Sequence, residues 1–162
     1  MNTLEAIRTK RSIRQFTAER VPEELIYKIL EAGRHAQSSK NEQPWTFILI
    51  RDRERLKAVG ECGKYAGHLA GADFAIVLVD DNNWPFDMGQ AAAYLQLAAW
   101  ELGVSSCLAY FGLQDELKAL LGIPAEASAE MGLSFGYSAE GPRRGKKTGR
   151  KPLDDIVRKE HF

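Results

Sequence analysis

Two kinds of apolar pattern alternate along this chain. In the first kind, apolar residues recur every three or four positions, which is the period of an amphipathic helix. This pattern predicts helices at residues 3–10, 21–36, 53–63, 87–103 and 113–122. In the second kind, nearly every residue of a short run is apolar, as in a strand that is covered on both faces. Such runs predict strands at residues 46–50, 73–81, 104–111 and 129–137.

Helices that alternate with buried strands predict an α+β fold, in which helices flank a mixed central sheet. No composition break or linker divides the chain, so we expect a single domain over residues 1–162. A chain of this length can bury a hydrophobic core of its own.

The segment 87–103 predicts a long central helix that is apolar on more than one face. The residues that make it so are Ala91, Ala92, Ala93, Leu95, Leu97, Ala98, Ala99 and Trp100. One chain of 162 residues has limited surface with which to cover such a helix. We therefore expect a second copy of the chain to bury the remainder, which predicts a homodimer.

The stretch QSSKNEQPW, residues 37–45, interrupts this periodicity with Ser, Asn and Pro, and predicts a loop. Its side chains at Ser38, Ser39, Asn41 and Gln43 offer hydrogen-bond donors and acceptors next to a predicted strand. They would suit a polyol or the edge of a heterocycle. Taken alone, they are equally typical of a polar turn.

Cations gather at both ends of the chain. Lys10, Arg11 and Arg14 surround Ser12, and an extended segment would point Lys10, Ser12 and Arg14 to one side. Because arginine can bind oxyanions with two hydrogen bonds, this group suits a phosphate. A second cluster consists of Arg143, Arg144, Lys146, Lys147, Arg150 and Lys151. Either cluster alone is also typical of a solvated run of charges.

The overall charge narrows the function classes. Lys and Arg number 22 and Asp and Glu number 22, so the formal net charge is zero. A general nucleic-acid binder would usually carry a basic surplus, so the charge argues against that class.

The cysteines and the apolar runs exclude two further kinds of site. Cys62 and Cys107 lack the spacing of a metal site, and no apolar run is long enough to span a bilayer. We expect a cytoplasmic protein with reduced cysteines, no membrane contact and no metal.

Common catalytic motifs are missing from the sequence. It lacks the dinucleotide fingerprint G-x-G-x-x-G, a P-loop, a G-x-S-x-G elbow and an H-E-x-x-H zinc motif. His35, His68 and His161 are scattered, and we interpret each as structural. The sequence therefore predicts no catalytic side chain that acts as a nucleophile.

Taken together and in order, several segments resemble the nitroreductase family of FMN-dependent NAD(P)H oxidoreductases. The segments are RSIRQF (11–16), SSKNEQPW (38–45), DMGQAAAYLQLAAWELGVSSC (87–107), LLGIP (120–124), FGY (135–137) and GRKPLDDIV (149–157). The resemblance covers nearly the whole chain and implies a nitroreductase-like sheet with a long central helix.

The resemblance also implies a role for each polar segment. Ser12 and a neighbouring cation would hold the FMN phosphate, while Arg14 would lie either there or near the pyrimidine edge of the ring. The implied FMN-binding residues are Lys10, Arg11, Ser12, Arg14, Ser38, Ser39, Asn41, Tyr110, Arg150 and Lys151. Of these, Ser38, Ser39 and Asn41 would contact the ribityl chain and the ring. The backbone near Tyr110 would face flavin N5 and O4, and Arg150 and Lys151 would contact the phosphate.

By this resemblance the protein transfers hydride from NAD(P)H to FMN, and electrons then pass to a nitroaromatic, a quinone or a similar small acceptor. Because no second, Gly-rich nicotinamide site is visible, we expect ping-pong kinetics. The FMN would lie at the interface of the homodimer. Two alternatives stay open, a flavin-binding carrier or sensor without turnover and a nucleic-acid-binding module. Lys10 and Gln37 depart from the family pattern, and short connections between elements imply an open pocket.

Overall fold

The computed structural model describes residues 2–81, 84–141 and 149–161. A four-stranded sheet lies at its centre, in the order β1-β2-β4-β3. Its strands are β1 (Trp45–Ile50), β2 (Phe74–Asp80), β3 (Ser105–Tyr110) and β4 (Ser128–Gly136). All three neighbouring pairs are antiparallel. Within the described residues the parallel component of the sheet is one isolated bridge, between Ser12 and Ser106.

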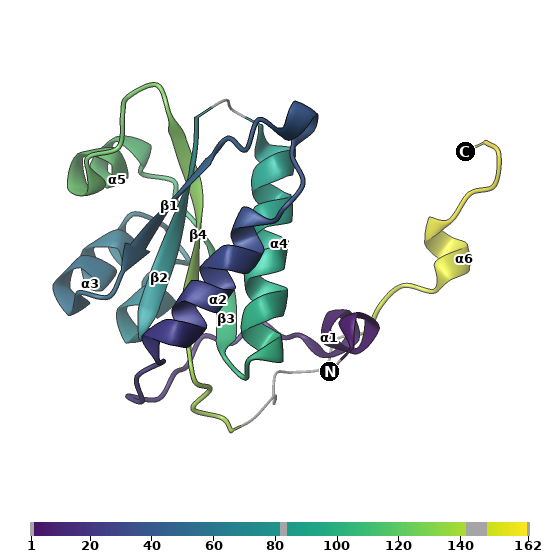
Figure 1. The fold of residues 1–162 in the computed structure, drawn as a ribbon, viewed down its shortest axis with the longest axis horizontal. Helices are drawn as coiled ribbons and strands as arrows, with labels where there is room; N and C mark the ends of the chain where they lie inside the picture. The colour runs from purple at the N-terminus through teal and green to yellow at the C-terminus, as the bar shows by residue number, and fades with distance from the viewer. Residues whose placement is uncertain (1, 82–83, 142–148, 162) are drawn as a thin grey trace.

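Helices cover both faces of this sheet (Figure 1). One face carries α2 (Glu23–Arg34) and α4 (Pro85–Glu101). The other carries α3 (Arg53–Glu61), η2 (Gly67–Gly71) and α5 (Gln114–Leu121). The short helix α1 (Thr3–Thr9) packs against α4. The predicted α+β fold, with a central sheet flanked by helices and a long central helix, is confirmed.

The core is built around β2, whose seven residues are all buried. Because side chains alternate along a strand, Phe74 and Ile76 face α2 and α4, while Ala75 and Val77 face the opposite layer. The Phe74 ring stacks on Phe135 of β4 with 4.7 Å between ring centroids. This strand therefore joins the two hydrophobic layers, as its continuous apolar run predicts.

The long central helix α4 ends just before a left-handed glycine. The helix begins at Pro85 and ends at Glu101, two residues before Gly103, whose φ of 79° is left-handed. Glycine adopts this conformation without a Cβ clash, which explains why the helix stops there. The prediction placed the helix at 87–103, so it is right in position and length.

The C-terminal segment extends away from the sheet (Figure 1). It contains α6 (Leu153–Ile156), and three apolar side chains stand exposed on it, Leu153, Ile156 and Val157. Nothing in the described part of the chain is a helix both long and apolar enough to cross a membrane.

Candidate functional site

The N-terminal cations lie on an extended segment along the edge strand β3. The backbone N–H of Ile13 donates to the carbonyl oxygen of Ser106 at 3.0 Å. Ile13 is buried and its neighbours Ser12 and Arg14 are exposed, which is the alternation of an extended chain. The segment therefore has the conformation on which the predicted grouping of Lys10, Ser12 and Arg14 depends.

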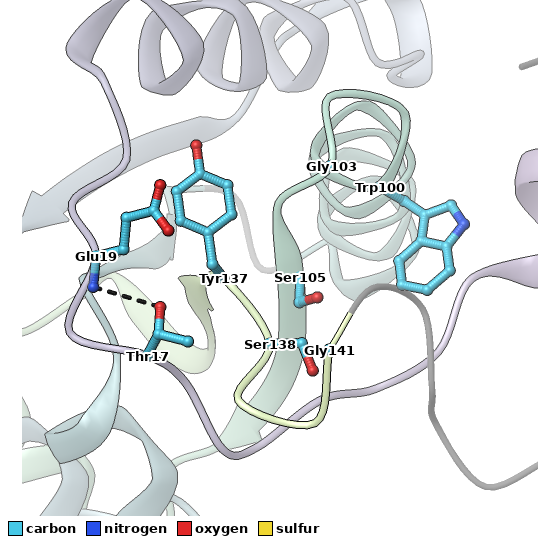
Figure 2. Close-up of a pocket in the computed structure, with 8 residues that line it drawn as sticks. All are labelled: Thr17, Glu19, Trp100, Gly103, Ser105, Tyr137, Ser138 and Gly141. Carbon is cyan, nitrogen blue, oxygen red and sulfur yellow. Dashed lines mark hydrogen bonds between the residues drawn. The ribbon is translucent and has the colours of Figure 1, made fainter.

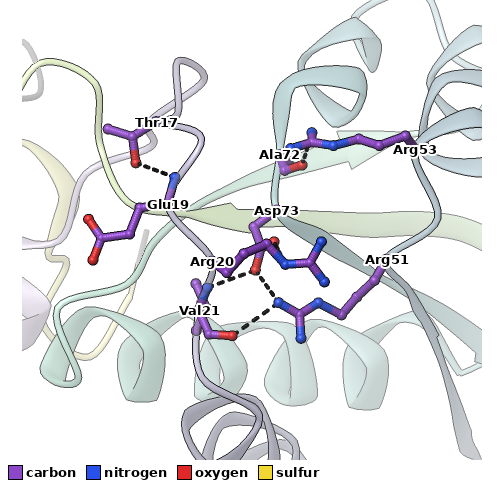
Figure 3. Close-up of polar contacts among 8 residues, drawn as sticks. All are labelled: Thr17, Glu19, Arg20, Val21, Arg51, Arg53, Ala72 and Asp73. Atoms are coloured by element: carbon purple, nitrogen blue, oxygen red, sulfur yellow. Dashed lines mark hydrogen bonds and ion pairs between the residues drawn. The ribbon is translucent and has the colours of Figure 1, made fainter.

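A buried carboxylate anchors the far end of this segment (Figure 3). Oδ2 of Asp73 accepts hydrogen bonds from the backbone N–H of Val21 at 2.9 Å and from Nη2 of Arg51 at 2.8 Å. Nε of Arg20 lies 3.0 Å from Oδ1 of the same carboxylate. Asp73 is 2% exposed, so its charge depends on these partners for stabilisation. The network fixes where the N-terminal segment leaves the edge of the sheet.

Ser12 reaches a buried thiol on β3. The Ser12 side chain and the charges of Lys10 and Arg14 each act on Cys107 to lower the pKa of its thiol. Burial nevertheless outweighs these three effects and raises the pKa of Cys107. Cys107 is 1% exposed, and its sequence context did not indicate that it would lie beside Ser12.

A histidine lies beside the same group. Nδ1 of His68, in η2, lies 2.8 Å from the hydroxyl oxygen of Ser134 on β4. Burial and then the charge of Arg14 lower the pKa of His68. The sequence interpretation of His68 as one of three scattered structural histidines did not anticipate its place beside Arg14.

The cations of this cluster lack carboxylate partners. Burial lowers the pKa of Lys10, and no Asp or Glu in the described part of the chain forms an ion pair with Lys10 or Arg14. A partly buried ammonium next to a guanidinium is costly unless an anion compensates the charge. With the Ser12 hydroxyl beside them, these residues fit a phosphate group.

Arg11 differs from Lys10 and Arg14 because its guanidinium binds backbone carbonyl oxygens at the end of α1. Its Nη1 donates to the carbonyl oxygens of Arg8 at 3.0 Å and Lys10 at 2.8 Å. These bonds satisfy backbone acceptors at the C-terminal end of α1, where a cation also stabilises the helix dipole. In this structure the guanidinium of Arg11 therefore helps to end α1.

The second predicted segment forms a strained loop around η1 (Ser39–Asn41). Lys40, Asn41 and Gln43 have φ angles of 50°, 60° and 51°. A left-handed conformation costs a non-glycine residue roughly 1–2 kcal/mol. The Ser38 hydroxyl accepts from the backbone N–H of Gln43 at 2.9 Å, which supports this turn.

Asp87 of α4 holds the loop from below. Its Oδ2 accepts a hydrogen bond from the backbone N–H of Ser39 at 3.0 Å, and the carboxylate is 3% exposed. Ser39 and Asn41 remain exposed above it. Asp87 is the first residue of the helix predicted at 87–103, and the sequence pattern did not indicate this positioning contact.

The predicted loop and the strand β3, which is bridged to the cation segment, contact opposite sides of α4. Ser39 bonds to Asp87 near the start of the helix, whereas Gln96 contacts Ser106, which is bridged to Ser12. Asp87 and Gln96 are nine residues apart, which is about 14 Å along the axis and two and a half turns. The helix itself therefore stands between the loop and the cation cluster of one chain.

The remaining predicted residues lie elsewhere. Tyr110 ends β3 with 60% of its surface exposed, and its carbonyl oxygen would lie 2.2 Å from a Cβ on Gly63. Arg150 and Lys151 are exposed on the C-terminal segment. The other predicted cations, Arg143, Arg144, Lys146 and Lys147, lie outside the described residues.

A separate pocket of about 230 Å³ opens near the C-terminal end of α4 (Figure 2). Its walls include Trp100, Ser105 and Tyr137, and Glu19 lies at its rim beside Tyr137. Burial, followed by the charges of Glu19 and Asp73, raises the pKa of Tyr137. This pocket contains none of the predicted site residues. The described residues also contain no group of His, Cys, Asp and Glu that could hold a metal ion.

Comparisons of the sequence and of the structure with known proteins agree on one family. The model of the Nitroreductase family matches residues 7–137. The chain is 38% identical over 146 residues to an Archaeoglobus fulgidus protein described as an NADH dehydrogenase/NAD(P)H nitroreductase, covering 83% of this chain and 84% of that one. A Methanothermobacter thermautotrophicus protein of the same description is 35% identical over 153 residues, with 88% and 80% covered. Among solved structures, an FMN-dependent nitroreductase from Clostridium difficile R20291 superimposes with a TM-score of 0.87 at 29% identity, covering 99% of this chain and 100% of that one.

Proposed function

This chain belongs to the nitroreductase family, and from that premise we propose that it is an FMN-dependent oxidoreductase that takes electrons from NAD(P)H. The observation that carries the proposal is the pair of cations at Lys10 and Arg14, which have no carboxylate partner in the described part of the chain. A phosphate there would compensate their charge and accept a hydrogen bond from Ser12.

FMN, when bound, supplies the hydride and electron chemistry of such an enzyme. Lys10 and Ser12 would hold its phosphate. Arg14 would either join them or lie against the pyrimidine edge of the ring, where its fixed positive charge would attract electron density. The exposed side chains of Ser39 and Asn41 would orient the polar parts of the cofactor, because Asp87 holds their loop in place.

We propose that the cofactor site is formed by two chains of a homodimer. Within one chain, Ser39 and the strand that bridges to Ser12 contact α4 on opposite sides and about 14 Å apart along its axis, which favours a site in which the two residues come from different copies. The surface beside α4 suits such an interface, because Leu4, Ile7 and Leu108 are exposed by 79%, 58% and 45%.

The acceptor is proposed to be a nitroaromatic, a quinone or a similar small molecule. Only four residues, 81–84, lie between β2 and α4, so this connection is too short to form a covering helix above Asp87. NAD(P)H and the acceptor would take turns at one ring face, which gives ping-pong kinetics. Cys62 and Cys107 are both unbridged thiols, which fits the proposed cytoplasmic location.

An absorption spectrum of the purified protein, recorded before and after NAD(P)H under nitrogen, tests the proposal. A flavin spectrum that bleaches within seconds is the expected result, and heating should release FMN rather than FAD. A colourless protein that FMN cannot reconstitute would overturn it.

The spectrum, together with a DNA-binding assay, distinguishes the proposed enzyme from the two alternative functions. Bound flavin that NAD(P)H does not bleach would identify a carrier or sensor. Salt-dependent binding to DNA by a colourless protein would favour the nucleic-acid module.

A further inference from the structure

His68 is the titratable group of the cation cluster that the proposed function leaves without a role. Its Nδ1 is paired with the Ser134 hydroxyl at 2.8 Å. Its Nε2 is buried and has no hydrogen-bond partner among the residues that the structure describes. An imidazole nitrogen in this state is costly, because burial removes water without supplying another partner.

The hydroxyl of Ser134 holds the ring from beneath. Ser134 is fully buried, and its Oγ also donates to the carbonyl oxygen of Cys107 at 3.4 Å. If the single hydroxyl proton is directed to Cys107, then Nδ1 of His68 must carry the ring proton and donate to Ser134. The neutral ring then has its Nε2 lone pair free to take up a second proton.

Among the described residues, the groups that act on this ring come from the N-terminal segment, from β3 and from β4. Arg14 approaches from the N-terminal segment and disfavours the protonated ring. Ser134 on β4 contacts the ring and also bonds to the backbone of Cys107 on β3, whose thiol stays protonated because burial raises its pKa. A contact with the backbone of Leu108, outside ordinary hydrogen-bond geometry, acts in the opposite direction to Arg14. The element η2 itself, GHLAG, contributes no other charge.

We propose that His68 is a further binding residue of the cofactor site and takes up a proton when the phosphate-bearing ligand binds. The proposal rests on the proposed function, because it requires an anionic ligand beside Arg14. An anion there compensates the guanidinium charge that disfavours a protonated His68. The protonated ring then adds a second attractive charge to the site.

The sign of the pH dependence follows from this linkage. Without ligand, burial and Arg14 keep the pKa of His68 below its usual 6.5, so the ring is neutral near pH 7. The bound anion raises that pKa. Between the two values one proton is taken up on binding, so affinity increases as pH falls through that window. Each pKa unit of difference corresponds to a tenfold change in affinity.

Protonation of the FMN phosphate has the opposite effect on the pH dependence of FMN affinity. It gains a proton near pH 6 and then binds cations less strongly. The contribution of His68 is therefore the difference between the unaltered protein and a His68→Gln variant, in which the side chain keeps a donor and an acceptor but does not titrate. We expect FMN affinity in His68→Gln to lose up to about tenfold relative to the unaltered protein at pH 5.5, and little at pH 8.

The direct experiment is NMR titration of the histidine ring signals, with FMN or inorganic phosphate as the probe. The chain has three histidines, and His35 and His161 are exposed outside the cluster, so they serve as internal controls. We expect the pKa of His68 to rise on adding FMN. This readout uses the unaltered protein, so it stands even if His68→Gln fails to fold. A His35→Gln variant should bind FMN as the unaltered protein does.

The outcomes are distinct. FMN that binds while the pKa of His68 stays unchanged would overturn the inference and leave the proposed function intact. Absence of FMN binding, measured by flavin fluorescence, would overturn both. A shift produced by inorganic phosphate as well as by FMN supports the inference and places the phosphate beside Arg14. A shift with FMN but none with saturating inorganic phosphate would overturn the inference as stated, because the oxidised flavin ring is neutral and cannot compensate the charge of Arg14.

Discussion

The backbone N–H of Ser39 lies 3.0 Å from Oδ2 of Asp87, a carboxylate buried at the start of α4. This bond joins a helix to a loop whose backbone is left-handed at three non-glycine residues. Such a conformation persists only where its surroundings support it. The contact therefore explains how Ser39 and Asn41 can stand exposed in a fixed geometry.

Replacing Asp87 by Ala should loosen this loop. The change leaves the Ser39 N–H without its acceptor, at a cost of about 1–3 kcal/mol. We expect weaker FMN binding by fluorescence titration, with the cation cluster intact. Asp52→Ala is a matched control, because Asp52 also accepts from a backbone N–H, that of Arg55 at 2.8 Å, but in α3. Equal FMN affinity in the two variants would contradict the role of Asp87.

Arg14→Ala should weaken FMN binding by about ten- to a hundredfold, since a charge-assisted hydrogen bond contributes roughly 1.5–3 kcal/mol. Arg150→Ala is expected to act in the same direction. Arg11→Ala should also weaken binding, through the end of α1 that its guanidinium supports. Lys159→Ala, outside both clusters, is the control. Retention of FMN by all four variants would refute the assignment of a phosphate site.

Lys10→Met should stabilise the protein without FMN and weaken its binding of FMN. Burial lowers the pKa of Lys10, so the folded state binds fewer protons than the unfolded chain between that value and 10.5. Stability should then rise with pH across this window in the unaltered protein, and the rise should diminish in the variant. Thermal unfolding at several alkaline pH values measures it. Lys28→Met, which breaks an exposed pair with Glu24, should keep the pH dependence of the unaltered protein.

A site shared between two chains predicts complementation. Arg14→Ala damages the cation cluster and Asp87→Ala damages the loop, so each variant alone has only damaged sites. In a mixed dimer, one site combines both defects and the other combines two intact halves. After unfolding and refolding an equal mixture, we expect about a quarter of the sites to bind FMN normally. Mixtures that bind no better than the average of the separate variants would show that each site lies within one chain.

Steady-state kinetics test whether NAD(P)H and the acceptor bind in turn at the same face of the flavin ring. Double-reciprocal lines for NAD(P)H at several fixed acceptor concentrations should be parallel, and oxidised acceptor at high concentration should compete with NAD(P)H. Intersecting lines would indicate that both substrates bind together.

The elements could be predicted because their patterns are local. The run at 73–81 gave β2 at 74–80, and the apolar pattern at 87–103 gave α4 at 85–101. The strand order β1-β2-β4-β3 could not be predicted from the sequence, because pairing between distant segments leaves no periodic pattern in either segment. An apolar run also does not say whether its neighbours are parallel, and the strands of the predicted mixed sheet pair antiparallel.

The site was predictable to a lesser degree. The residue types at 10–14 indicated an anion, but only the fold brings His68 and Cys107 to that segment from distant elements. Left-handed backbone at Lys40 and Asn41 is equally hidden, since neither residue is glycine. Whether Lys10 through Lys151 form one binding site stays a prediction.

The position of α4 between Ser39 and Ser12 has a consequence for how the protein behaves on dilution. If each flavin needs two chains, cofactor retention follows the monomer–dimer equilibrium, and once dimers become scarce the fraction of chains that hold FMN falls in proportion to the protein concentration. Specific activity would then decrease in dilute assays, and added FMN would restore it by driving chains together. The cofactor would in this way act as an assembly factor, and the abundance of the protein would set how much of it is an enzyme.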